Sequence, residues 1–143
     1  MKRSEALAIL SRDHHRALVN AQKLARATDE GSATAARAGF LDFWDEEGRR
    51  HFQLEEELLF PAYASHGEAR HPLVLRALGD HVAIRAQAAG LAATERPPAE
   101  VLNELGKALA AHVRLEEREL FPLIEEAMPA EELLALANAL DTA

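Results

Sequence analysis

Apolar residues recur at every third or fourth position along nearly the whole chain of 143 residues. That spacing is the one that places apolar side chains along one face of an α-helix. Strand signals are almost absent, because aromatic residues make up only 5% of the chain while Ala, Leu, Glu and Arg dominate. The pattern therefore predicts an all-α fold.

The periodicity is interrupted by short stretches rich in Gly, Pro, Ser, Thr and Asp, such as TDEGSA at 28–33 and TERPPA at 94–99. These breaks leave expected helices at about 4–27, 35–64, 72–93 and 99–127, with a short further segment from Pro129. Four amphipathic helices of this length with short loops predict an up-down-up-down four-helix bundle with a short C-terminal fifth helix. The size of the chain fits a single domain, residues 1–143.

The formal net charge of −8 argues against nucleic acid and anionic membrane surfaces as partners, since both would repel the chain. The absence of cysteine excludes disulfides and thiolate metal sites. The first residues, MKRSEALAIL, make a poor signal peptide because Glu5 interrupts their short apolar stretch, and no apolar run of about 18 residues follows. The expected location is the cytoplasm.

An eleven-residue sequence occurs twice, as HFQLEEELLFP at 51–61 and as HVRLEERELFP at 112–122, with seven identical positions. In each copy a glutamate follows a histidine by four residues, giving the pairs His51/Glu55 and His112/Glu116. Residues at this spacing lie on the same face of a helix, about 6 Å apart along its axis. Two helices are thus expected to present an imidazole and a carboxylate together.

Both pairs lie on the apolar face of their helix. The face of the second helix runs through His51 and Glu55 and includes Phe40, Trp44, Gly48, Leu58 and Ala62. The face of the fourth runs through His112 and Glu116 and includes Leu102, Leu105, Leu109, Leu120 and Leu123. Pro61 and Pro122, at the ends of the two copies, are expected to kink or finish their helices.

Each of the other two helices also places a histidine on its apolar face. His81 lies on the face of the third helix and His14 on that of the first, while His15 points about 100° away. The interior would then hold four imidazoles and two carboxylates. A buried ionised carboxylate costs several kcal/mol unless a cation compensates it, and no lysine lies on these faces. The pattern predicts a buried metal site.

The type of side chain indicates which metals are suitable. Imidazole nitrogen and carboxylate oxygen without thiolate suit iron, manganese or zinc. Six side chains do not supply enough ligands to fill the coordination of two metal ions. This leaves room for a bridging oxo or hydroxo group and for an open position. An open position is typical of reactive rather than purely structural sites.

These motifs resemble the hemerythrin-like family of HHE cation-binding four-helix bundles. The resemblance covers essentially the whole chain, from SRDHHRAL through DHVAIR to HVRLEERELFP. It implies a non-haem di-iron centre, with two iron ions and a bridging oxo or hydroxo group, that binds dioxygen or nitric oxide or senses iron or redox state. Carried onto this sequence, the ligand positions of the family fall on His51, Glu55, His81, His112 and Glu116.

Three positions depart from the oxygen-carrying members or stay ambiguous. Arg85 stands where those carriers have a second histidine one turn after the helix-three histidine. Glu117 is an alternative to Glu116, because carriers tend to use a carboxylate five residues after the helix-four histidine. In the first helix, the helical face favours His14, whereas the local string HRAL favours His15 as the ligand.

The remaining acidic residues near the motifs are expected to serve the surface. Glu56, Glu57, Glu117 and Glu119 fit a solvated acidic face, and Asp13 and Asp80 could hydrogen-bond to an imidazole. Three classes of function stay open on the sequence. They are a di-iron protein that binds a diatomic ligand or senses iron, a di-iron enzyme acting on peroxide or nitric oxide, and a zinc-holding structural or interaction bundle.

Overall fold

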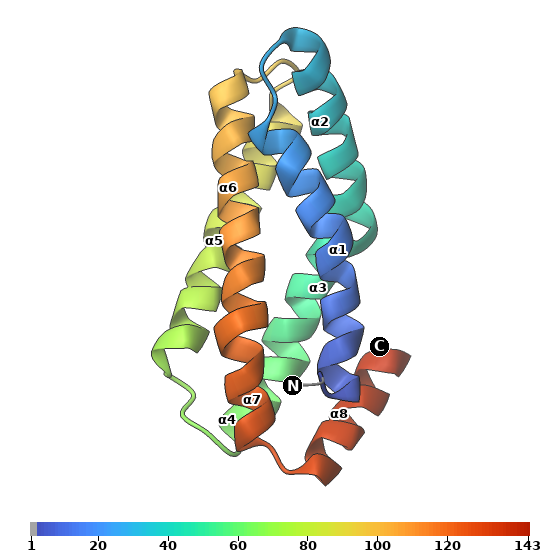
Figure 1. Ribbon diagram of the computed structural model, residues 1–143, viewed down its shortest axis with the longest axis vertical. Coiled ribbons are helices and arrows are strands. Elements are labelled where there is room, and N and C mark those ends of the chain that lie inside the picture. Colours follow the sequence, from blue (N-terminus) through green and yellow to red (C-terminus); the bar gives the residue numbers. More distant parts are fainter. Residues whose placement is uncertain (1–2) are drawn as a thin grey trace.

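The computed structural model describes residues 3–143, which form helices and loops without any strand. Figure 1 shows long helices running side by side in alternating directions, with the last helix, α8, packed across one end. The predicted all-α fold, a four-helix bundle with a short C-terminal helix, is confirmed. The predicted domain bounds of 1–143 include residues 1 and 2, which lie outside the described part of the chain.

The elements follow the chain in four long helical stretches and one short one. The first is α1 (Glu5–Ala25). The second is α2 (Glu30–Phe43), η1 (Trp44–Gly48), α3 (Arg49–Leu54), η2 (Glu55–Leu59) and α4 (Phe60–Ala64), in which η marks a π-helical turn. The third is α5 (Pro72–Ala93). The fourth is α6 (Ala99–Leu115), η3 (Glu116–Leu120) and α7 (Phe121–Ala127), and α8 (Ala130–Thr142) completes the fold.

The third and fourth stretches have the predicted bounds, whereas the second begins earlier than expected. Asp29 caps α2 by accepting a hydrogen bond from the Ser32 N–H, and the Ser32 hydroxyl contacts the Asp29 backbone in return. This capping box makes a helix start out of a stretch that looked like a loop. The prediction that helix two begins near Ala35 is therefore wrong, and α1 ends at Ala25, two residues short of the predicted Ala27.

Both repeated motifs contain a π turn that begins at the motif glutamate. The backbone N–H of Phe60 donates to the carbonyl of Glu55, and that of Phe121 donates to the carbonyl of Glu116. Each turn ends just before the motif proline, which lacks an N–H and conflicts with the preceding turn of a regular α-helix. Because the wider turn accommodates the proline, both helices continue past it, to Ala64 and Ala127. Of the two expected outcomes at each proline, a kink or the end of the helix, the end of the helix is wrong.

The π turns also shift which residues face the core. A π turn holds one more residue than an α turn, so the buried face moves one position along the chain after it. Leu59 and Tyr63 are buried instead of the predicted Leu58 and Ala62, which are only partly buried. In the fourth helical stretch, Ile124 is buried where Leu123 was predicted.

The apolar core is split into two clusters, one toward each end of the bundle. One includes Leu10 and Ala77, at the end covered by α8, and the other includes Ala17 and Ile84. His14 and His81 lie between these positions on α1 and α5, so a layer of polar side chains separates the clusters. None of the described helices is both long and apolar enough to cross a membrane.

Candidate metal centre

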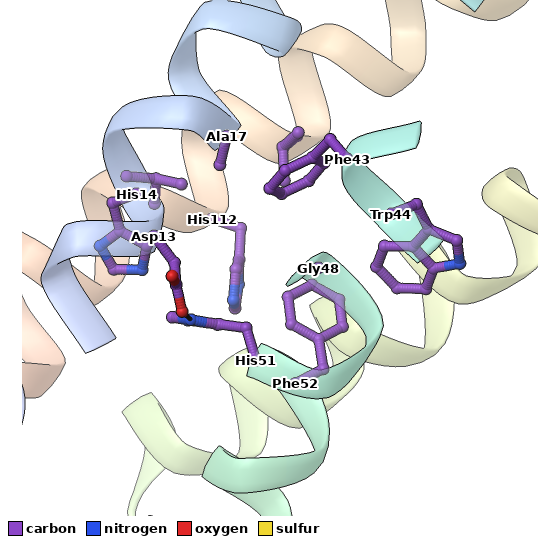
Figure 2. A pocket seen from close by; sticks show the side chains of 11 residues that line it. Asp13, His14, Ala17, Phe43, Trp44, Gly48, His51, Phe52 and His112 are labelled. Atoms are coloured by element: carbon purple, nitrogen blue, oxygen red, sulfur yellow. Dashed lines mark hydrogen bonds and ion pairs between the residues drawn. The ribbon is translucent and has the colours of Figure 1, made fainter. Parts of the chain in front are cut away.

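Each of the four long helical stretches contributes one buried histidine to the polar layer. They come from α1, α3, α5 and α6, and no more than 5% of any of them is exposed: His14, His51, His81 and His112. Glu55 and Glu116, the first residues of η2 and η3, are fully buried in the same layer. Figure 2 shows three of the imidazoles converging beside a small pocket.

The first pair of imidazoles, from His14 and His51, faces one oxygen of each glutamate. The Nε2 atom of His14 lies 2.9 Å from Oε1 of Glu116. The Nε2 atom of His51 lies 3.2 Å from Oε2 of Glu55 and 3.7 Å from Oε1 of Glu116. Ligand atoms of all four residues lie within 4.8 Å of one another, close enough to bind one metal ion.

The second pair faces the remaining oxygens of the same two glutamates. His81 Nε2 lies 3.0 Å from Oε1 of Glu55, and His112 Nε2 lies 3.3 Å from Oε2 of Glu116. These four residues again bring their ligand atoms within 4.8 Å of one another. Each carboxylate thus gives one oxygen to each imidazole pair, so two cations held by the two groups would each have an oxygen of both carboxylates within reach.

The hydrogen bonding at this layer tests whether the residues fit a metal. Six buried side-chain atoms have no hydrogen-bond partner among the described residues: His51 Nε2, Glu55 Oε1, Glu55 Oε2, His81 Nε2, His112 Nε2 and Glu116 Oε2. Buried polar atoms are rarely left unpaired, because each costs free energy. All six belong to the two groups just described and face the space between the pairs, so these residues fit bound cations.

Every imidazole is also held on its outer side by a carboxylate. The Nδ1 atoms of His14, His51, His81 and His112 lie 3.0, 3.0, 2.7 and 3.0 Å from Glu117, Asp13, Glu56 and Asp80, respectively. An imidazole whose Nδ1–H donates to a carboxylate keeps the lone pair of Nε2 for a metal. The outer carboxylates therefore fix both the orientation and the tautomer of the candidate ligands.

These outer contacts correct part of the sequence interpretation. Glu56 and Glu117 belong to the site and are not only members of a solvated acidic face. Asp13 and Asp80 do bond to imidazoles, although each reaches across to another helix and not to the histidine that follows it. A signal for them was present, since Asp-His occurs at 13–14 and 80–81, and a second glutamate follows each motif glutamate, at 55–56 and 116–117.

His15 and Arg85, which the sequence analysis singled out, both lie outside the two ligand groups. His15 is exposed on α1, so among the two adjacent histidines only His14 is brought to the other ligands. The guanidinium of Arg85 donates to both carboxylate oxygens of Glu56, at 3.2 and 3.1 Å. Arg85 thus occupies the position of a second histidine without facing the centre, and it holds the carboxylate that orients His81.

The charges in the layer shift its pKa values in opposite directions. Burial acts to lower the pKa of His112, but Glu116 and Asp80 outweigh it and raise that pKa to about 10. Burial also acts to lower the pKa values of His14 and His51. Nearby carboxylates outweigh it, so the pKa of His14 is raised and that of His51 is raised well above its usual range. Burial acts to raise the pKa of Glu116, yet the imidazoles hold it well below its usual value.

These shifts predict how the stability of the metal-free protein depends on pH. The raised pKa of His112 stabilises the fold fully below about pH 6.5, and this contribution is lost as pH rises through about 10. The lowered pKa of Glu116 contributes above about pH 4.5 and is lost as the pH falls further. We expect the melting temperature of metal-free protein to be highest between about pH 5 and 6.5. Thermal melts across the pH range check this, and a rise in stability from pH 7 to 10 would contradict it.

The outer carboxylates predict an effect on metal affinity without a change in the ligands. Glu56→Ala leaves the Nδ1 atom of His81 without its acceptor, and such changes typically weaken metal binding by about 10–100-fold. Glu57→Ala, at the exposed neighbouring position, is the matched control and should bind metal like the wild type. Competition with a chelator measures both affinities, and equal values for the two variants would show that Glu56 does not support the site.

A small apolar cavity lies against three of the four imidazoles. It measures about 20 Å³ and is lined by Asp13, His14, Ala17, Phe43, Trp44, Gly48, His51, Phe52, Leu109, His112 and Val113. A cavity needs about 10–15 Å³ to hold one water molecule, so this one has room for a very small ligand. The fourth imidazole, His81, is instead covered by Phe52, whose ring stacks on it at a centroid distance of 3.9 Å.

Residues 6–124 match the family model of the hemerythrin HHE cation binding domain. Because the match spans most of the chain and includes all six candidate ligands, the protein belongs to the hemerythrin HHE cation-binding family. Comparison with curated proteins and with solved structures gave no match. The α8 helix lies beyond the matched residues.

Proposed function

We propose that this protein holds two iron ions between its four histidines and two glutamates, and that the centre binds dioxygen or nitric oxide or senses iron or redox state. One observation carries the proposal: Glu55 and Glu116 are each shared between two imidazole pairs, and six of the buried atoms there lack any other partner. Iron bound there would supply an open coordination position and an electron for a diatomic ligand.

The proposed ligands are His14, His51, His81, His112, Glu55 and Glu116. His14 is preferred to the exposed His15, and Glu116 to Glu117, because only the preferred residue of each pair lies in the ligand groups. The protein supplies two nitrogens and two oxygens at each position, which leaves an iron ion of six-coordinate preference with positions to fill. Manganese and zinc accept the same donors, so metal identity is part of what must be measured.

The surroundings of the centre support a small uncharged ligand. The apolar cavity beside His14, His51 and His112 is too small for an organic substrate, and rings and aliphatic side chains make up most of the rest of its lining. Dioxygen and nitric oxide are small and weakly polar, so moving from water into such a space is favourable for them. The net charge of −8 argues against a nucleic acid or an anionic membrane as partner, and the cytoplasmic location expected from the sequence stays part of this proposal.

Metal analysis combined with spectroscopy tests the proposal. Protein purified without added metal should contain about two iron ions per chain, and exposing the reduced protein to dioxygen or nitric oxide should produce a charge-transfer absorption band. The band should disappear when the gas is removed. Continuous consumption of peroxide or nitric oxide, faster than with free iron, would point to the enzyme alternative. Zinc or no metal, with no spectral response to either gas, would contradict the proposal and favour a structural bundle.

A further inference from the structure

The small cavity and an outer groove have one lining residue in common, Trp44. The groove lies between α2–η1 and α5, measures about 370 Å³, and is lined by Leu41, Trp44, Asp45, Arg49, Arg85, Ala88, Ala89 and Ala92. Trp44 is the one residue that lines both this groove and the cavity. Its side chain therefore stands between the outside of the bundle and the candidate metal centre.

The indole of Trp44 is held by other rings. It stacks on Phe40 at a centroid distance of 6.1 Å and meets the ring of Phe52 edge-on at 5.3 Å. On the outer side, the guanidinium of Arg49 lies 6.0 Å from the indole and pairs with Asp45 at 2.9 Å. Figure 2 shows Trp44 and Phe43 on the side of the pocket opposite His14 and Asp13.

Gly48 allows the indole to occupy this place. A Cβ atom at position 48 would lie 2.7 Å from Cε3 of Trp44, which is closer than real Cβ contacts come, and a tight 3.0 Å from Cε2 of Phe43. Trp44 and Gly48 are the first and last residues of η1, and the Arg49 N–H donates to the carbonyl of Trp44. The π turn thus places the indole over a residue that has no side chain to displace it.

A second groove also reaches the cavity, by a polar route. It measures about 320 Å³, is lined mainly by charged residues, and shares Asp13 and His51 with the cavity. Opening it would break the 3.0 Å contact between His51 and Asp13 and would move a candidate ligand. Displacing Trp44 instead exchanges contacts among rings, and the alanines beside it offer a path that suits an apolar gas.

We propose that Trp44 is a gate, which swings aside to admit a diatomic ligand from the groove between α2–η1 and α5 into the cavity. The inference rests on the proposed function, since it concerns the ligand of the same centre. Trp44 is a residue that governs access and does not touch the metal. It sets the rates of ligand entry and exit. A substitution that alters the gate should change both rates together and should therefore change the affinity for the ligand little.

Stopped-flow binding of nitric oxide to reduced, iron-loaded protein tests the gate. Trp44→Ala should raise the association and dissociation rate constants about tenfold or more. Ala89→Leu, at an exposed position in the groove, fills the path without touching the core and should lower the association rate constant severalfold. Leu54→Ala, in the second groove, is the control and should leave both rates unchanged. Faster entry in Leu54→Ala, with no change in Trp44→Ala and Ala89→Leu, would overturn the proposal.

A measurement without metal distinguishes failure of the gate from failure of the proposed function. Trp44 is the only tryptophan of the chain, so dissolved oxygen that quenches tryptophan fluorescence reports access along this groove. In metal-free protein, Ala89→Leu should lower the quenching rate constant severalfold, and Leu54→Ala should not. Equal quenching in wild type and Ala89→Leu would overturn the gate. Wild-type protein that takes up no iron or does not respond to either gas would overturn the proposed function while leaving the quenching result to decide on access.

Discussion

Glu116→Gln is expected to remove both metal ions and not only one. The Oε1 atom of Glu116 faces the His14/His51 pair and its Oε2 atom faces His112, so one substitution takes an anionic ligand from each position. The amide that replaces it carries no charge and offers a single oxygen. Elemental analysis of the purified variant should give well under one ion per chain, against about two in the wild type.

The same variant should lose the stabilisation that metal gives. A ligand present at about 1,000 times its dissociation constant stabilises the folded state by about 4 kcal/mol, which raises the melting temperature by many degrees. Added iron should therefore raise the melting temperature of the wild type and leave that of Glu116→Gln unchanged. Glu119→Gln, exposed on the same π turn, is the matched control. Two ions retained in Glu116→Gln would show that the carboxylate does not bridge them.

Alanine substitution of one or the other of the two adjacent histidines on α1 should affect metal content differently. His14→Ala removes one of the two imidazoles of the first position and leaves the four ligands of the second complete. We expect this variant to keep about one ion per chain and to lose its charge-transfer response to gas, since two of the three imidazoles beside the cavity belong to the position that is lost. His15→Ala changes an exposed side chain and should keep both ions and the full response. Loss of metal in His15→Ala with none in His14→Ala would reverse the assignment.

The sequence predicts the four long helices and the six central residues because both depend on local periodicity. Spacing by threes and fours identifies the face on which His51 and Glu55 lie, and charged residues on an apolar face need a buried partner. The carboxylates that hold the imidazoles in place depend instead on contacts between helices across the bundle. The bonds of Asp13 and Asp80 to imidazoles of other helices depend on how those helices are placed, which spacing within one helix does not reveal.

Local exceptions to helical geometry account for the remaining errors. The start of α2 depends on a reciprocal hydrogen-bond pattern between Asp29 and Ser32, in a stretch whose composition is typical of loops. The π turns add a residue to a turn, so a strict count places Leu58 and Ala62 in the core when Leu59 and Tyr63 are there. Each of these turns contains a candidate ligand or the proposed gate, which agrees with the frequent occurrence of π turns at functional sites.

The polar layer between the two apolar clusters has a consequence for cooperativity in folding. Apolar contacts join the four helices above the layer and below it, but within the layer the neighbours are charged groups whose balance depends on protonation. Without metal, we expect the half of the bundle covered by α8 and the opposite half to open partly independently of each other. Two ions bridged by Glu55 and Glu116 would tie all four helices at mid-height and make the bundle open as one. Metal supply would then decide how many protease-sensitive partial openings the chain undergoes, as well as whether its centre is occupied.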